Sequence, residues 1–147
     1  MALAMNSSQL SNPTLLRRLM CIVYEALLLA AIMFIAGFLF IYATNYPQHP
    51  ALRPVLQIFL LLIVVGYFVW FWCKSGQTLA MKTWRLRVQG EQGELLSAAQ
   101  TLKRFALALF GLLLGGITIW WVWFDPEKQF LHDRLARSRI VLLKNKK

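Results

Sequence analysis

Residues 19–43 read LMCIVYEALLLAAIMFIAGFLFIYA, and Glu25 is the only charged side chain among them. A helix needs about 20 apolar residues to cross roughly 30 Å of membrane hydrocarbon, so this run is long enough to span a bilayer. It is also too long for the apolar part of a signal peptide, and it carries an acid. We therefore interpret it as a transmembrane helix.

Two further apolar runs, residues 54–73 and 105–124, contain no charged side chain. Lipid admits only helices or closed barrels as spans, and barrel strands alternate in polarity, which these runs do not. The chain is 59% hydrophobic, above the apolar share of roughly half in soluble domains. We expect an all-α integral membrane protein with two transmembrane helices and a third apolar segment.

The chain is strongly basic, with 16 Lys and Arg against 6 Asp and Glu. Such a balance indicates nucleic acid or an anionic membrane surface as the partner, and the apolar content favours the bilayer with anionic headgroups over nucleic acid. Arg53 is the only basic residue between the first two runs. The positive-inside rule then predicts a multi-pass protein of a bacterial-type inner membrane with its N-terminus in the cytoplasm.

The third apolar run, residues 105–124, has two interpretations. Three complete spans from a cytoplasmic N-terminus would export the basic segment that follows the third run. Gly115 and Gly116 lie inside this run, and glycine pairs favour breaks. We favour a re-entrant hairpin that turns at the glycines and returns the tail to the cytoplasm. The alternative is an ordinary third span that uses Gly111 and Gly115 as a GxxxG packing face.

Two segments outside the apolar runs have strand-like patterns. Residues 82–89 alternate between apolar and basic side chains, and residues 139–143 are apolar and β-branched. The stretch GEQGE at 90–94 indicates a turn, and Ser97 is a suitable N-cap for a helix. We expect a small cytoplasmic β-ribbon, with amphipathic interfacial segments as the alternative.

Glu25 is the acid that has to be explained, because an ionisable group inside a membrane is costly and indicates a functional site. Arg18 lies about two helical turns earlier on the same face. The other candidate partners in this intramembrane charge network are Lys82, Arg104 and Arg134. The alternative is a structural ion pair that fixes how the helices pack.

Asp133 is the second acid of interest, within LHDRLARS at residues 131–138. On a helix it would lie four residues from Arg137 and pair with it locally. In the re-entrant arrangement this segment, with His132 and Arg134, returns to the side where Arg18 and Glu25 lie. Asp133 is therefore included in the predicted charge network.

Enzymatic chemistry is not expected from this sequence. It contains no phosphate-binding loop, metal-ligand cluster or nucleophile elbow, so we predict no cofactor, no metal and no catalytic residue. Its two cysteines, Cys21 and Cys73, have no metal-ligand spacing, and a structural disulfide is not expected.

Three stretches of the chain, RRLMCIVYEALLL, GQTLAMKTWRLRVQGEQGELLSAAQTLKRF and FDPEKQFLHDRLARSRIVLL, resemble the RDD family of small membrane proteins. The family is named for one Arg and two Asp. The resemblance places Arg18 at the family Arg and Asp133 at the second Asp, while Glu25 stands where the first Asp is expected. It implies a single membrane domain over residues 14–143, with a flexible N-terminus over 1–13 and a basic tail over 144–147.

The resemblance implies transport of unidentified ligands, because some members are described as cation/proton antiporters. Two spans and a hairpin enclose little space, so a transporter of this size implies a homo-oligomer. The alternative hypothesis is a non-catalytic membrane interaction or scaffold protein, whose basic cytoplasmic face binds anionic lipid or a membrane partner.

Overall fold

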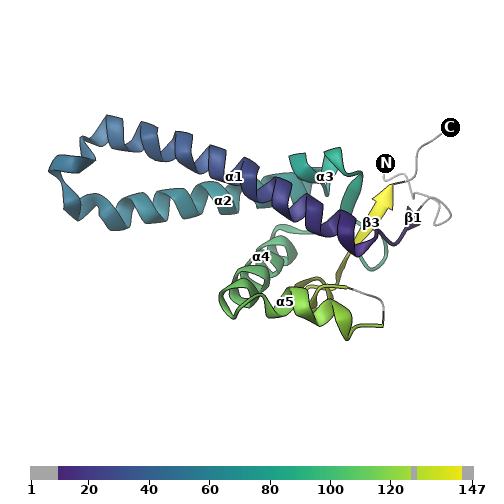
Figure 1. The fold of residues 1–147 in the computed structure, drawn as a ribbon. Helices are drawn as coiled ribbons and strands as arrows, with labels where there is room; N and C mark the ends of the chain where they lie inside the picture. Colours follow the sequence, from purple (N-terminus) through teal and green to yellow (C-terminus); the bar gives the residue numbers. More distant parts are fainter. Residues whose placement is uncertain (1–9, 127–128, 144–147) are drawn as a thin grey trace.

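The computed structural model describes residues 10–126 and 129–143 (Figure 1). The predicted basic tail over 144–147 lies outside the described residues, as does most of the predicted flexible N-terminus. Within the described part, Leu10–Ser11 form a short strand, β1.

Two long helices form an antiparallel hairpin, α1 (Leu15–Thr44) and α2 (Arg53–Lys74). They are joined by two 3-10 turns, Tyr46–Gln48 and Pro50–Leu52. The Thr14 side chain accepts a hydrogen bond from the backbone N–H of Arg17 and caps the start of α1. Both helices are long and apolar enough to cross a membrane, so the two predicted spans are confirmed as helices.

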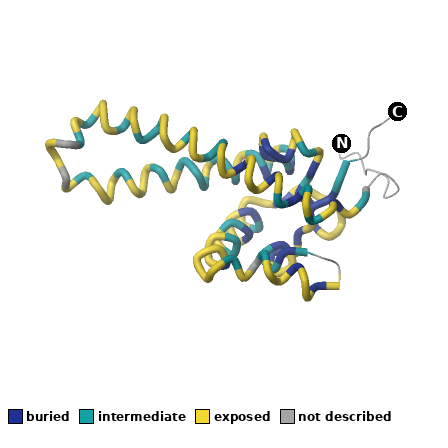
Figure 2. Tube along the Cα trace, in the orientation of Figure 1, coloured by how far each residue is buried: buried dark blue, intermediate teal, exposed yellow. Residues whose placement is uncertain are grey.

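The outward faces of this hairpin are apolar and exposed (Figure 2). Exposed apolar surface costs about 25 cal/mol per Å² in water, and a patch this large indicates contact with another apolar phase. The large exposed side chains on these two helices include Leu27, Phe34, Ile35, Phe38, Leu39, Ile58, Leu62 and Trp70. The hairpin therefore has the surface of a membrane-embedded element.

The third apolar run is broken at its glycines. The helix α4 (Ala98–Leu113) begins with a capping box made by Ser97 and Gln100, as the sequence predicted for Ser97. It ends just before Gly115 and Gly116, which both have φ of +77°, and a shorter helix α5 (Ile117–Trp120) follows. The predicted break is confirmed, and one continuous third helix is not formed.

A small antiparallel sheet lies at one end of the hairpin. Strand β2 (Leu86–Gly90) pairs with β3 (Ser138–Leu143), and β1 pairs with the other edge of β3. The predicted pairing of these two strands is confirmed, but the first strand begins later than predicted. Residues 82 and 83 end a helix, α3 (Leu79–Thr83), because Thr78 caps a helical turn before the chain can enter the sheet.

The sheet brings distant parts of the chain to the same end of the hairpin. β1 precedes α1, β2 follows α2 and α3, and β3 comes after α6 (Leu131–Leu135). The two 3-10 turns lie at the opposite end of the hairpin. A compact core under the sheet includes Trp72, Leu86, Val88, Leu96 and Phe130.

Candidate functional site

Glu25 is a buried carboxylate in the second helical turn after Arg18, and 8% of its surface is exposed. The Tyr67 hydroxyl on α2 donates to Glu25 Oε1 over 2.6 Å. The Thr78 hydroxyl donates to Oε2. Among the described residues no basic side chain lies within 4.0 Å of this carboxylate, so its local partners are hydroxyl groups.

The same two hydroxyls also accept hydrogen bonds from the backbone at the start of α3. The Leu79 N–H donates to the Tyr67 hydroxyl over 3.3 Å, and the Met81 N–H donates to Thr78 Oγ1 over 3.2 Å. Each hydroxyl therefore links a carboxylate oxygen of Glu25 to an amide of α3. Through these links the carboxylate on α1 holds together α2 and α3.

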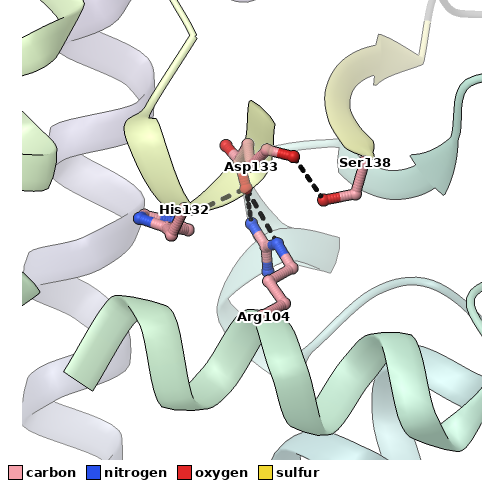
Figure 3. A network of polar contacts seen from close by, with 4 residues as sticks. All are labelled: Arg104, His132, Asp133 and Ser138. Carbon is pink, nitrogen blue, oxygen red and sulfur yellow. Dashed lines mark hydrogen bonds and ion pairs between the residues drawn. The ribbon is translucent and has the colours of Figure 1, made fainter. Parts of the chain in front are cut away.

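Asp133 forms a buried ion pair with Arg104 (Figure 3). Asp133 Oδ1 accepts from Arg104 Nε over 2.8 Å and from Nη2 over 2.5 Å. The guanidinium also lies 4.3 Å from the Trp72 ring centroid. The Ser138 hydroxyl donates to the Asp133 backbone carbonyl over 3.2 Å, which ties the end of α6 to the start of β3.

The predicted local pair of Asp133 with Arg137 is wrong. The helix α6 ends at Leu135, and Arg137 has a left-handed backbone with φ of 50°. Arg137 therefore does not continue the helical face on which Asp133 lies. The carboxylate instead points towards Arg104 on α4.

His132 lies beside this ion pair, with Nε2 3.5 Å from Asp133 Oδ1. Its ring stacks on Phe130 with 5.4 Å between centroids. Burial lowers the pKa of His132 to about 4; the nearby Asp133 carboxylate opposes this shift and the Arg104 guanidinium adds to it. His132 is therefore a neutral packing group at pH 7.

Arg18 is also buried, with 3% of its surface exposed. Its guanidinium lies 5.8 Å from the Phe130 ring centroid and within electrostatic range of Asp133. A cavity of about 350 Å³ is lined by Arg18, Glu25, Arg104 and His132, together with apolar side chains. The structure thus brings four of the predicted site residues to one cavity.

Two other predicted partners lie elsewhere. The Lys82 ammonium is 5.8 Å from the Phe71 ring centroid. Arg134 forms an ion pair with Asp125, an acid that the sequence interpretation did not single out. Neither basic residue pairs with Glu25.

The sequence interpretation also missed Tyr67 and Thr78, the hydroxyl partners of Glu25. The sequence position of Thr78 could have indicated its structural role, because it stands just before a short helical stretch where an N-cap is expected. Nothing in the sequence around Tyr67 indicated a contact with Glu25, because a single tyrosine in an apolar helix is common. In the described residues, no group of three or more His, Cys, Asp or Glu is arranged to hold a metal ion.

Comparison with known proteins supports the family resemblance. The chain is 33% identical over 95 residues to the uncharacterized protein YxaI of Bacillus subtilis (strain 168), covering 62% of this chain and 60% of that protein. It is 27% identical over 81 residues to the uncharacterized protein RP437 of Rickettsia prowazekii (strain Madrid E), covering 55% of this chain and 45% of that protein. The chain thus spans between about half and three fifths of these relatives' lengths.

No solved structure matches the chain. The model of the RDD family matches residues 12–137, which include both long helices, Glu25, Arg104 and Asp133. The two long apolar helices indicate a membrane-type protein, and so does the match to this family. The chain belongs to the RDD family.

Proposed function

We propose that the protein takes part in proton-linked cation transport, with Glu25 as the group that exchanges the proton or cation. The observation that carries the proposal is the environment of Glu25. It is a buried carboxylate inside an apolar helix, it lines a cavity, and it is held by two hydroxyls rather than by a basic side chain.

Hydroxyl partners suit an exchange site better than an ion pair does. A guanidinium would hold the carboxylate in its charged form, because an opposite charge favours ionisation. A hydroxyl group can donate to a carboxylate or accept from a carboxylic acid after rotation. Tyr67 and Thr78 therefore can support both protonation states of Glu25 without a large movement of the helices.

The proposed orientation places the sheet end of the hairpin in the cytoplasm of a bacterial-type inner membrane. The positions of the Lys and Arg residues support this orientation. Those in the described part of the chain lie in elements near the sheet end (Figure 1), except for Arg53 at the start of α2. In this orientation α4 enters the membrane and turns at Gly115 and Gly116. The exposed Trp120, Trp121 and Trp123 then lie near the headgroups, where tryptophan is enriched.

A homo-oligomer is part of the proposal. One hairpin encloses little volume, and its exposed apolar faces leave room for a second copy as well as for lipid. We propose no catalytic step and no cofactor for this activity.

The test measures Na⁺ flux driven by a pH gradient in proteoliposomes. Glu25→Gln removes the exchangeable proton and should abolish flux in a folded protein. Glu25→Asp keeps the acid and should retain flux. Glu91→Gln changes an exposed acid in the turn after β2 and serves as the matched control. Unaltered flux in a folded Glu25→Gln protein would end this proposal.

A non-catalytic membrane interaction or scaffold role is the second candidate. It is favoured by the cluster of basic side chains at the sheet end, since each Lys or Arg near an anionic surface contributes about 1 kcal/mol. Absence of flux in the parent protein, together with salt-sensitive capture of anionic vesicles, would favour this role over transport.

A further inference from the structure

A second cavity, which shares no lining residue with the one at Glu25, lies where α6 is followed by β3. Its volume is about 240 Å³, and its lining is polar and rich in arginine: Glu91, Gln129, Arg134, Arg137, Ser138 and Arg139. Sites for drug-sized ligands occupy roughly 300–1,000 Å³. The part of a ligand that enters this smaller cavity is therefore a single small polar group.

The three arginines reach the cavity from one continuous stretch of chain. Arg134 is on α6, Arg137 stands in the turn after that helix, and Arg139 belongs to β3. A short helix, a tight turn and a strand thus follow one another directly. Their succession brings three guanidinium groups to the same small space.

Positive charges around this cavity outnumber negative ones among the described residues. Arg134 forms an ion pair with Asp125. In the described part of the chain, no carboxylate, including that of Glu91, lies within 4.0 Å of the guanidinium groups of Arg137 and Arg139. Like charges that share a site repel each other, so a negatively charged group between these arginines would relieve their repulsion.

A phosphate group suits this lining better than a carboxylate does. A guanidinium is a planar fork of N–H donors that matches phosphate oxygens in pairs. A phosphate ester also has more strong acceptor oxygens than a carboxylate, so it can bind more than one guanidinium. The backbone amides of Ala136 and Arg137 donate to carbonyls of α6. The arginine side chains, rather than backbone groups, are therefore the groups that would hold the anion.

We propose that this cavity binds the phosphate group of a small phosphate ester or of a lipid headgroup, with Arg137 and Arg139 as its ligands. Arg134, held by Asp125, forms the wall beside them. For a lipid headgroup, the proposal rests on the second candidate function above and names the site through which the sheet end would contact the membrane. The site itself does not depend on proton or cation exchange at Glu25.

The chain contains a matched control for Arg137. The order of α6, Arg137 and β3 repeats the order of α3, Arg85 and β2. Both arginines have a left-handed backbone, with φ of 55° at Arg85 and 50° at Arg137, and both are exposed. Only Arg137 of the two lines the arginine-rich cavity. Substituting each in turn separates binding in the cavity from a general effect of basic charge.

The first test measures the binding of three compounds to the full-length protein in a neutral detergent at low salt, by isothermal titration calorimetry. Glycerol phosphate carries the phosphate alone, dihexanoyl phosphatidic acid carries it on a lipid, and dihexanoylglycerol lacks it. Binding of glycerol phosphate would show that the phosphate group is sufficient, whereas binding of phosphatidic acid alone would identify a lipid headgroup as the source. Failure of both phosphate compounds to bind, or equally tight binding of dihexanoylglycerol, would overturn the proposal.

The second test repeats the titration with variants. Arg137→Gly and Arg139→Gln should each weaken phosphate binding by about tenfold or more, because each loses charge-assisted hydrogen bonds. Arg85→Gly should keep the affinity of the parent. Glycine adopts positive φ without steric cost, so both glycine variants should fold, and size-exclusion chromatography checks this.

Equal affinities of the Arg137→Gly and Arg85→Gly proteins would contradict the proposed site. That result would leave the second candidate function standing if the protein still captured anionic vesicles. Loss of vesicle capture together with intact binding of glycerol phosphate would have the opposite meaning. The two failures can therefore be told apart, and flux through Glu25 is measured independently of both.

Discussion

Tyr67 and Glu25 are 42 positions apart in the sequence, and the hydroxyl of one donates to the carboxylate of the other over 2.6 Å. This hydrogen bond joins α1 to α2 within the hairpin. A second hydroxyl, from Thr78, occupies the other carboxylate oxygen. The hairpin is therefore held near its sheet end by a polar contact as well as by apolar packing.

Tyr67→Phe removes one donor from the buried carboxylate while keeping the ring. We expect the free energy of unfolding in detergent micelles to fall by about 1–3 kcal/mol, the cost of an unsatisfied buried polar group. Tyr24→Phe, at a position 44% exposed on α1, is the control and should change stability by less than about 0.5 kcal/mol. Equal effects of the two substitutions would show that the hydrogen bond is unimportant.

Arg104→Met should destabilise the protein by about 3–5 kcal/mol, because it leaves the buried Asp133 carboxylate without its partner. Lys103→Met changes the exposed neighbouring residue and should have little effect. Combining Arg104→Met with Asp133→Leu should recover most of the loss, since an apolar pair leaves no stranded charge. Chemical denaturation of the four proteins provides the measurement, and a double variant no better than Arg104→Met would contradict the interpretation.

His132 should make stability depend on pH. Its pKa falls from 6.5 to about 4 on folding, so the unfolded chain binds the proton more readily between these values. Stability is therefore lost as pH falls from about 6.5 to about 4, by up to about 3 kcal/mol at 1.36 kcal/mol per pKa unit.

His132→Phe keeps the stacking on Phe130 and removes the titrating group. The difference in melting temperature between the parent and this variant should shrink or reverse as pH falls through that window. His49→Gln, in the exposed turn between α1 and α2, should leave the pH profile unchanged. A parent and a His132→Phe protein with parallel profiles would contradict the prediction.

Gly116→Ala tests the break in the third apolar run. Nothing lies within 4 Å of a Cβ built at this residue, so no steric contact is added, and the cost comes from its φ of +77°. We expect a loss of about 1–2 kcal/mol. Gly66→Ala, within α2 and also open around its Cβ, should instead stabilise by up to about 1 kcal/mol.

The pairing of β1 with β3 can be tested with a disulfide. Ser11 and Leu142 face each other in the register, where Cα atoms lie about 4.5–5.5 Å apart, a distance that a disulfide can bridge. In a background with Cys21→Ser and Cys73→Ser, the pair Ser11→Cys and Leu142→Cys should oxidise readily. The off-register pair of Ser11→Cys with Ile140→Cys should not, and equal oxidation of both pairs would show that β1 is not held in this register.

The features that could be predicted from the sequence are those with local signals. Residues 19–43 and 54–73 are apolar except for a few polar side chains such as Glu25 and Gln57, so their helices follow from the cost of placing backbone polar groups in lipid. The break at Gly115 and Gly116 follows from their tolerance of positive φ. Ser97 indicated the start of α4 because it stands one residue before a helical pattern.

The features that could not be predicted depend on contacts between distant elements. The alternation of apolar and basic side chains over residues 82–89 predicted a strand along the whole stretch. Residues 82 and 83 instead belong to α3, the helix that Thr78 caps. Arg104 was considered as a partner for Glu25, yet it pairs with Asp133, because the fold brings α4 to α6. The hydroxyl of Tyr67 was not considered, since charges were expected to pair with charges.

The position of β3 in the sheet has a consequence for the order of assembly. β3 lies between β1 and β2, so neither of these strands has its partner until residues 138–143 leave the ribosome. In the proposed orientation, the hairpin of α1 and α2 can insert before then, because α2 already ends at Lys74. Membrane insertion and completion of the sheet are therefore separate events. A chain interrupted between them would carry an inserted hairpin and two strands without their partner. Proteases and chaperones can distinguish such a form from the finished protein.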